Sequence, residues 1–141
     1  MFDALDSLKP HAHWLLRIGL AGVFLFHGIG KVMDLGGFAQ MMGISTPVAA
    51  LVTFAEVAGG AGIIVGAFTN DLVTRLAGLA IAPVMLGAIF MVHWGRWGFE
   101  PAEGFPMGGM ELQVVVLFTA LFFLVMGNAG LTRTSGTEVS S

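Results

Sequence analysis

The chain has 141 residues, of which 56% are hydrophobic and only 11% are charged, and its formal net charge is −3. This composition excludes an ordinary water-soluble domain, and the lack of a basic run excludes nucleic acid as a partner. Because the chain contains no cysteine, it cannot hold an iron–sulfur cluster, a thiolate metal site or a disulfide.

Four apolar stretches are long enough to cross a membrane as helices, since about 20 apolar residues span about 30 Å of hydrocarbon. They run from Trp14 to Met33, from Val48 to Phe68, from Leu72 to Trp94 and from Glu111 to Leu131. A polar leader, residues 1–13, precedes them, and a flexible tail, residues 132–141, follows. The sequence therefore predicts an all-α protein whose residues 14–131 form an antiparallel four-helix bundle in a lipid bilayer.

The first stretch carries titratable residues near both of its ends. His27 and Lys31 are four positions apart, a spacing that places both on one face of a helix. Arg17 lies near the other end, where a long side chain can reach water. We therefore expect Arg17, like Arg75 at the start of the third stretch, to snorkel toward the membrane surface.

Two segments between the stretches are predicted to be loops. Residues 34–47 are rich in glycine, and we expect Phe38, Met41 and Met42 of this loop to lie on the bilayer surface. Residues 95–109 form the longest hydrophilic break in the chain.

Glu56 lies inside the second apolar stretch, about 12 Å beyond its start at about 1.5 Å per residue. A carboxylate at this depth costs about 2.5 to 3.5 kcal/mol on insertion, so it normally faces a protein interior and a partner. We expect Lys31 or His27 to be its charge partner, because no other cation reaches that depth from the same side. Glu56 is therefore predicted to belong to a functional site.

Small residues in the second stretch predict close packing between helices. Gly62 and Gly66 form a GxxxG pair, which Ala58 and Gly59 extend toward the start of the stretch. We expect these small-residue faces to contact a neighbouring helix, a partner subunit or a second copy of the chain. The same role is expected for four further glycines, namely Gly19, Gly22, Gly78 and Gly87.

The basic residues predict the orientation of the chain in the inner (cytoplasmic) membrane. One side of the membrane would hold Lys9, Arg17, Arg75 and Arg133, and the other would hold Lys31 and Arg96. Because basic residues favour the cytoplasmic side, we expect both termini in the cytoplasm.

Titratable residues from all four stretches are predicted to gather near the outer ends of the helices, because consecutive helices alternate in direction. These residues are His27, Lys31, Glu56, His93 and Glu111. The resulting polar pocket would open to the outer face and could bind a quinone headgroup or a small anion. We expect His27 and Glu56 to be catalytic and to handle protons, whereas Lys31, His93 and Glu111 would line the pocket.

A metal or a haem is a less favoured occupant of the same pocket. His27, Glu56, His93 and Glu111 would suit a metal by residue type, and the two histidines could hold a haem. The first two of these residues lie at least one turn deeper than the others, so a compact coordination shell would require tilted helices. We therefore predict neither metal nor haem.

The sequence resembles the DoxX family of small four-helix membrane proteins. The resemblance covers about residues 14–130 and rests on the segments Arg17-Ile18-Gly19, Phe24-Leu25-Phe26-His27-Gly28-Ile29-Gly30-Lys31, Phe54-Ala55-Glu56-Val57-Ala58-Gly59-Gly60, Met91-Val92-His93 and Gly109-Met110-Glu111. It implies a group in which some members are membrane subunits of sulfur-oxidising, quinone-reducing enzymes and others join thiol or superoxide stress complexes.

Two functions follow as expectations. The first is a membrane subunit of a quinone-linked oxidoreductase, related to sulfur, thiol or oxidative-stress chemistry, whose partner supplies the electrons. The second is a non-enzymatic assembly partner or small carrier of solute or lipid. A large exposed groove of small residues on the second helix would favour the second function. An apolar pocket beside His27 and Glu56 would favour quinone.

Overall fold

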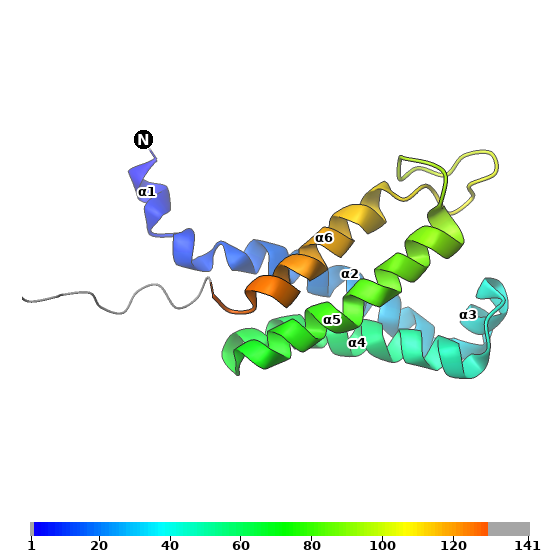
Figure 1. Ribbon diagram of the computed structural model, residues 1–141, viewed down its shortest axis with the longest axis horizontal. Helices are drawn as coiled ribbons and strands as arrows, with labels where there is room; N and C mark the ends of the chain where they lie inside the picture. Colours follow the sequence, from blue (N-terminus) through cyan, green and yellow to red (C-terminus); the bar gives the residue numbers. More distant parts are fainter. Residues whose placement is uncertain (1, 130–141) are drawn as a thin grey trace, which may run out of the picture.

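The computed structural model describes residues 2–129, and the elements in this part of the chain are helical (Figure 1). In chain order they are α1 (Asp3–Asp6), η1 (Lys9–His11), α2 (His13–Met33), α3 (Leu35–Met42), α4 (Thr46–Phe68), α5 (Asp71–Ala88), η2 (Ile89–His93) and α6 (Glu111–Met126). The predicted tail, residues 132–141, lies outside the described residues.

Among the described residues, three helices are long and apolar enough to cross a membrane, and α6 is a shorter apolar helix. The first three predicted spans are confirmed to within a few residues, with η2 continuing α5 in a wider π winding. The predicted end of the fourth stretch at Leu131 is wrong, because α6 ends at Met126. The backbone of Gly127, with φ 55° and ψ −123°, leaves the helix there.

The long helices pack mainly as sequence neighbours. α4 packs along α2 and α5, α6 packs along α5, and α2 touches α6 only sparsely. Figure 1 shows that the start of α2, the turn between α4 and α5 and the end of α6 share one end of the molecule. The buried core between the helices consists of Leu20, Phe24, Ile63, Ala77, Ile81, Met85, Val116, Ala120 and Phe123.

Glycines allow the helices to approach closely, though not all of those predicted to do so. A methyl group on Gly59 would meet Ile81, 2.6 Å away, and one on Gly78 would meet the Ala120 carbonyl oxygen, also 2.6 Å away. Gly66 packs in the same way against Thr74. Gly19, Gly22 and Gly87 do not pack against another helix of this chain, because a methyl group there would meet nothing within 4 Å in the described part of the chain.

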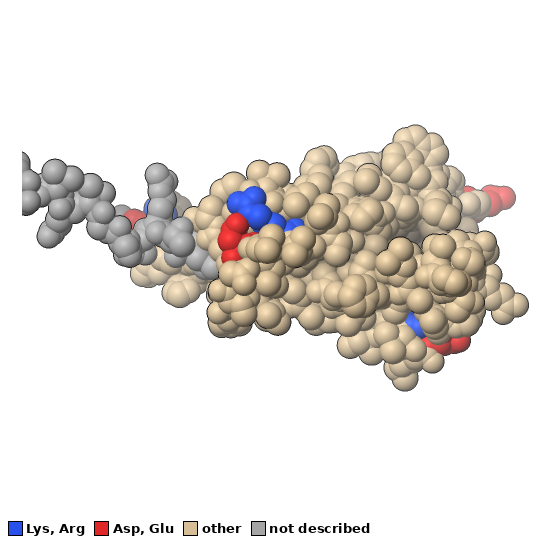
Figure 2. Space-filling model, turned by 60° about the horizontal axis from the view of Figure 1, so that its bottom comes forward, with Lys and Arg blue, Asp and Glu red and all other residues tan. Residues whose placement is uncertain are grey.

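Large apolar side chains cover the outside of the helices. Leu15 is 78% exposed, Phe54 69% and Phe118 66%. On the face that Figure 2 shows, charged side chains gather toward the two ends and leave a broad uncharged band between them. Water does not favour such a surface, whereas a lipid bilayer does.

The prediction of a loop at residues 34–47 is wrong in part, because residues 35–42 form the helix α3. The Asp34 carboxylate accepts a hydrogen bond from the Gly37 backbone N–H at 2.8 Å, which caps the start of the helix. Gly43, at φ 63°, ends the helix in the left-handed conformation. Met41, which was expected to lie on the bilayer surface, is 63% exposed.

Candidate functional site

An ion pair between α2 and α4 is the centre of the candidate site. The Lys31 Nζ lies 2.5 Å from each carboxylate oxygen of Glu56. The Glu56 side chain is 4% exposed and that of Lys31 19%. The prediction that Lys31 or His27 is the charge partner of Glu56 is confirmed for Lys31.

Two glycines bring α2 and α4 close enough for this pair to form. A methyl group on Gly28, three residues before Lys31, would lie 2.7 Å from the side chain of Val57 and 3.2 Å from the Glu56 Cβ. A methyl group on Gly60 would lie 3.1 Å from Phe24. The glycines therefore let the two backbones approach closely next to the ion pair.

Gly28→Leu is expected to reduce the free energy of unfolding by about 1 to 3 kcal/mol, because the larger side chain overpacks the contact between α2 and α4. Chemical unfolding in mixed micelles, followed by circular dichroism, would measure this loss. Gly22→Leu is the matched control on the same helix, since an added methyl group there meets nothing within 4 Å. Equal losses in the two variants would contradict the close packing at Gly28.

A cavity of about 670 Å³ lies between the end of α2 and α3. It is lined by Phe26, His27, Ile29, Gly30, Lys31, Met33, Asp34, Gly37, Phe38 and Met41. The Lys31 ammonium lies 4.9 Å from the centre of the Phe38 ring, a cation–π contact that joins α2 to α3. His27 is exposed and packs edge-on against the Phe26 ring. The cavity is therefore mainly apolar, with the polar side chains of His27, Lys31 and Asp34 in its wall.

His93 lies in a different polar arrangement, at the start of the loop of residues 94–110. It is 7% exposed, and its Nδ1 lies 3.0 Å from the Gly108 carbonyl oxygen. Its Nε2 lies 3.0 Å from the Gln113 Nε2 in the first turn of α6. These contacts correspond to an imidazole that donates from Nδ1 and accepts at Nε2. Glu111 begins α6, and neither His93 nor Glu111 lines the cavity.

The five predicted site residues are thus divided between two places. The structure brings Glu56 and Lys31 together and places His27 on the cavity that Lys31 lines. Among residues 2–129 no three His, Asp or Glu side chains lie close enough to hold a metal ion. Both ring nitrogens of His93 face protein groups, which leaves neither free to ligate a haem.

A second polar cluster, centred on Arg17, lies at the opposite end of the helices. Arg17 is 1% exposed, so the expectation that its side chain snorkels to water is wrong. Its guanidinium donates to His13 Nδ1 at 3.1 Å, to Thr74 Oγ1 at 3.2 Å, to Asn128 Oδ1 at 2.7 Å and to the Ile63 carbonyl oxygen. The guanidinium carbon also lies 4.8 Å from the centre of the Phe123 ring.

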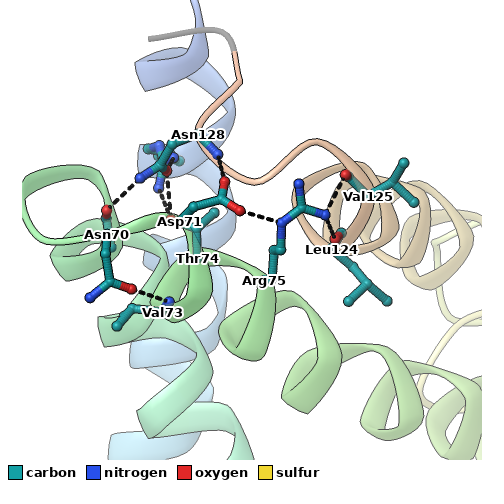
Figure 3. A network of polar contacts seen from close by, with 10 residues as sticks. Asn70, Asp71, Val73, Thr74, Arg75, Leu124, Val125 and Asn128 are labelled. Atoms are coloured by element: carbon teal, nitrogen blue, oxygen red, sulfur yellow. Dashed lines mark hydrogen bonds and ion pairs between the residues drawn. The ribbon is translucent and has the colours of Figure 1, made fainter. Parts of the chain in front are cut away.

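Asn128, which follows α6, connects this arginine to the ends of α4 and α5. Figure 3 shows Asn128 beside Asp71 and Thr74 of α5. Its side-chain amide donates to the Gly66 carbonyl oxygen at 2.9 Å, and its backbone N–H donates to Asp71 at 2.6 Å. Asp71 pairs with Arg75, which donates to the carbonyl oxygens of Leu124 and Val125 at the end of α6. The cations thus face helix C-termini and the carboxylate lies at a helix N-terminus, as the helix dipoles favour.

Sequence reasoning missed this cluster because it judged Arg17 by its distance from the helix end alone. His13 and Arg17 are four residues apart, so their contact was readable from the sequence. Asn128 carried no such signal, since it contacts Arg17 only because α6 ends and the chain turns at Gly127.

Apolar helices of membrane-spanning length, with lipid-compatible side chains on their outer faces, define a multi-pass membrane protein. The family model for DoxX matches residues 12–94, which is more than half of the chain. The chain therefore belongs to the DoxX family. Comparisons with curated proteins and with solved structures give no match. The matched range includes His27, Lys31, Glu56 and His93, and it ends before α6.

Proposed function

We propose that this protein is a membrane subunit of a quinone-linked oxidoreductase, and that the cavity between α2 and α3 binds the quinone headgroup. The observation that carries the proposal is a mainly apolar cavity of about 670 Å³ with the polar side chains of His27, Lys31 and Asp34 in its wall. Small-molecule sites commonly have about 300 to 1,000 Å³ and few polar groups among apolar walls. A quinone ring is flat and apolar, and its two carbonyl oxygens accept hydrogen bonds.

The residues of the cavity fit this ligand by chemistry. His27 and Lys31 supply N–H donors for the carbonyl oxygens, while Phe26 and Phe38 supply aromatic surface. Glu56 orients Lys31 and balances its charge in a place where an unpaired ammonium would be costly. The ion pair with Glu56 thus keeps an ammonium N–H of Lys31 in the cavity wall.

Reduction of the quinone to hydroquinone requires two electrons and two protons. A partner subunit that carries a redox centre, reduced by a sulfur or thiol compound, would supply the electrons. The protons would come from a protonated His27 and from the pair of Lys31 and Glu56. Each donor loses an N–H or O–H proton to a quinone oxygen and regains one from water at the membrane surface.

The packing of α4 favours this function over an assembly module. Gly59, Gly60 and Gly66 are buried against α2 and α5 of the same chain, so these glycines form no exposed groove for a partner helix. A quinone site was expected to have an apolar pocket beside His27 and Glu56; the cavity is lined by His27 and by Lys31, the ion-pair partner of Glu56, while Glu56 itself is not in its wall.

His27→Ala is expected to weaken binding of a short-tailed ubiquinone analogue about tenfold, because one hydrogen bond to the headgroup is lost. Equilibrium binding to the purified protein in lipid nanodiscs would measure the change. His11→Ala is the matched control, since His11 is exposed and lies outside the cavity.

Glu56→Gln should fold and still bind the analogue, yet lose quinone reduction in the complex purified with its partner. No binding by the unaltered protein, together with co-purification of a partner that holds no redox centre, would contradict the proposal and favour the assembly module.

The termini are expected in the cytoplasm, in the inner membrane. The first turn of α2 and the end of α6 lie at the same end of the molecule (Figure 1), which also holds Arg17 and Arg75. Because the chain has no cysteine, single substitutions can be labelled selectively. A membrane-impermeant maleimide should label Glu103→Cys on intact spheroplasts and Lys9→Cys only after lysis. The reverse pattern would place the cavity on the cytoplasmic side.

A further inference from the structure

The leader before α2 folds into two short helical pieces, α1 (Asp3–Asp6) and the 3-10 helix η1 (Lys9–His11). Backbone hydrogen bonds join Leu5 N–H to the Phe2 carbonyl at 2.9 Å, Leu8 N–H to the Leu5 carbonyl at 3.0 Å and His11 N–H to the Leu8 carbonyl at 2.9 Å. Residues three apart are neighbours on one face of a helix. Phe2, Leu5 and Leu8 therefore form a single stripe along the leader.

The side chains of this apolar stripe are exposed, and two charged side chains lie beside it on the leader. Phe2 is 73% exposed, Leu5 53% and Leu8 57%. Asp6 and Lys9, also three residues apart, form an ion pair at 2.7 Å, with side chains 61% and 76% exposed. The leader is thus amphipathic, with an apolar side and a charged side.

The position of the leader points to what covers the apolar side. Figure 1 shows that α1 turns away from the line of α2 instead of extending it. The Trp14 ring packs against Phe68 at 5.3 Å between ring centres, so the start of α2 lies level with the end of α4. The leader therefore begins where the membrane-spanning segments end. Leu15 and Ile18, which follow on α2, already present 78% and 63% of their surfaces outward.

We propose that residues 2–11 lie along the membrane surface, with Phe2, Leu5 and Leu8 inserted into the lipid interface. The occupant of this surface is the lipid of the membrane that α2 crosses, because the leader begins where the membrane-spanning segments end and its apolar side chains are exposed there. The pair of Asp6 and Lys9 would face water. A short amphipathic segment of this kind fixes the depth and tilt of the helix that it precedes.

Nitroxide labels on single cysteines would test the proposal with the full chain, in vesicles of phosphatidylcholine and phosphatidylglycerol. Leu5→Cys and its neighbour Asp6→Cys form the matched pair. The label at position 5 should collide several-fold more often with oxygen, which concentrates in lipid, than with a water-soluble nickel complex. The label at position 6 should show the opposite preference.

Two results would overturn the proposal. Equal access of the nickel complex to both labels would place the leader in water. Strong dipolar coupling between position-5 labels on two molecules, lost on dilution with unlabelled protein, would mean that the stripe packs against a second copy.

Discussion

Arg17→Met is expected to reduce the free energy of unfolding by about 2 to 4 kcal/mol. The substitution leaves Thr74, Asn128 and the Ile63 carbonyl without their cationic donor, and each buried group that loses its partner costs about 1 to 3 kcal/mol. Among residues 2–129 no carboxylate pairs directly with Arg17, so these uncharged oxygens are its compensation. Reversible unfolding in mixed micelles, followed by circular dichroism, would measure the loss.

Two further variants separate this network from a general effect of removing a cation. Lys9→Met removes a cation whose side chain is 76% exposed and should change stability by less than about 0.5 kcal/mol. Asn128→Ala should cost less in the Arg17→Met background than in the unaltered protein, because the two residues share a hydrogen bond. Strictly additive losses, or an Arg17→Met variant as stable as Lys9→Met, would contradict the network.

Lys31→Met is expected to cost about 3 to 5 kcal/mol, because it leaves the carboxylate of Glu56 buried without a partner. Glu56→Gln should cost only about 1 to 2 kcal/mol. The difference follows from exposure, since the Lys31 side chain is 19% exposed and can turn toward the membrane surface, whereas that of Glu56 is 4% exposed.

The double variant Lys31→Met with Glu56→Gln provides the control. It should be more stable than Lys31→Met alone, because it no longer buries an unpaired charge. The same unfolding measurement applies. If the two single losses are equal and add in the double variant, the ion pair does not contribute to folding in the way proposed.

The sequence by itself was sufficient to predict the long apolar helices. A span requires a continuous run of apolar residues, and that property is local, so the ends of α2 and α4 lie close to their predicted positions. A cationic partner for Glu56, either Lys31 or His27, was also predictable, because an acid so deep in a span needs a cation at matching depth. The structure decided for Lys31.

The predictions for residues 35–42 and for the end of the fourth helix were wrong because local sequence signals there conflicted. Gly36 and Gly37 have low helix propensity, so residues 35–42 read as a loop, although Asp34 and Gly43 supply caps at both ends. In α6 the apolar run continues in composition beyond Met126, but Gly127 turns the backbone and Asn128 then reaches Arg17.

Only the tertiary structure decided which polar residues meet, because helix tilt and rotation depend on packing that a single sequence does not specify. Helix packing separated titratable residues that were predicted to lie at similar depth. Lys31 and His27 share a cavity with α3, while His93 turned instead toward Gly108 and Gln113. Arg17 is only 1% exposed, since acceptors from α4, α5 and the segment after α6 converge on its guanidinium. Depth along a helix is a property of the sequence, whereas the direction in which a side chain finds its partner is a property of the assembled helices.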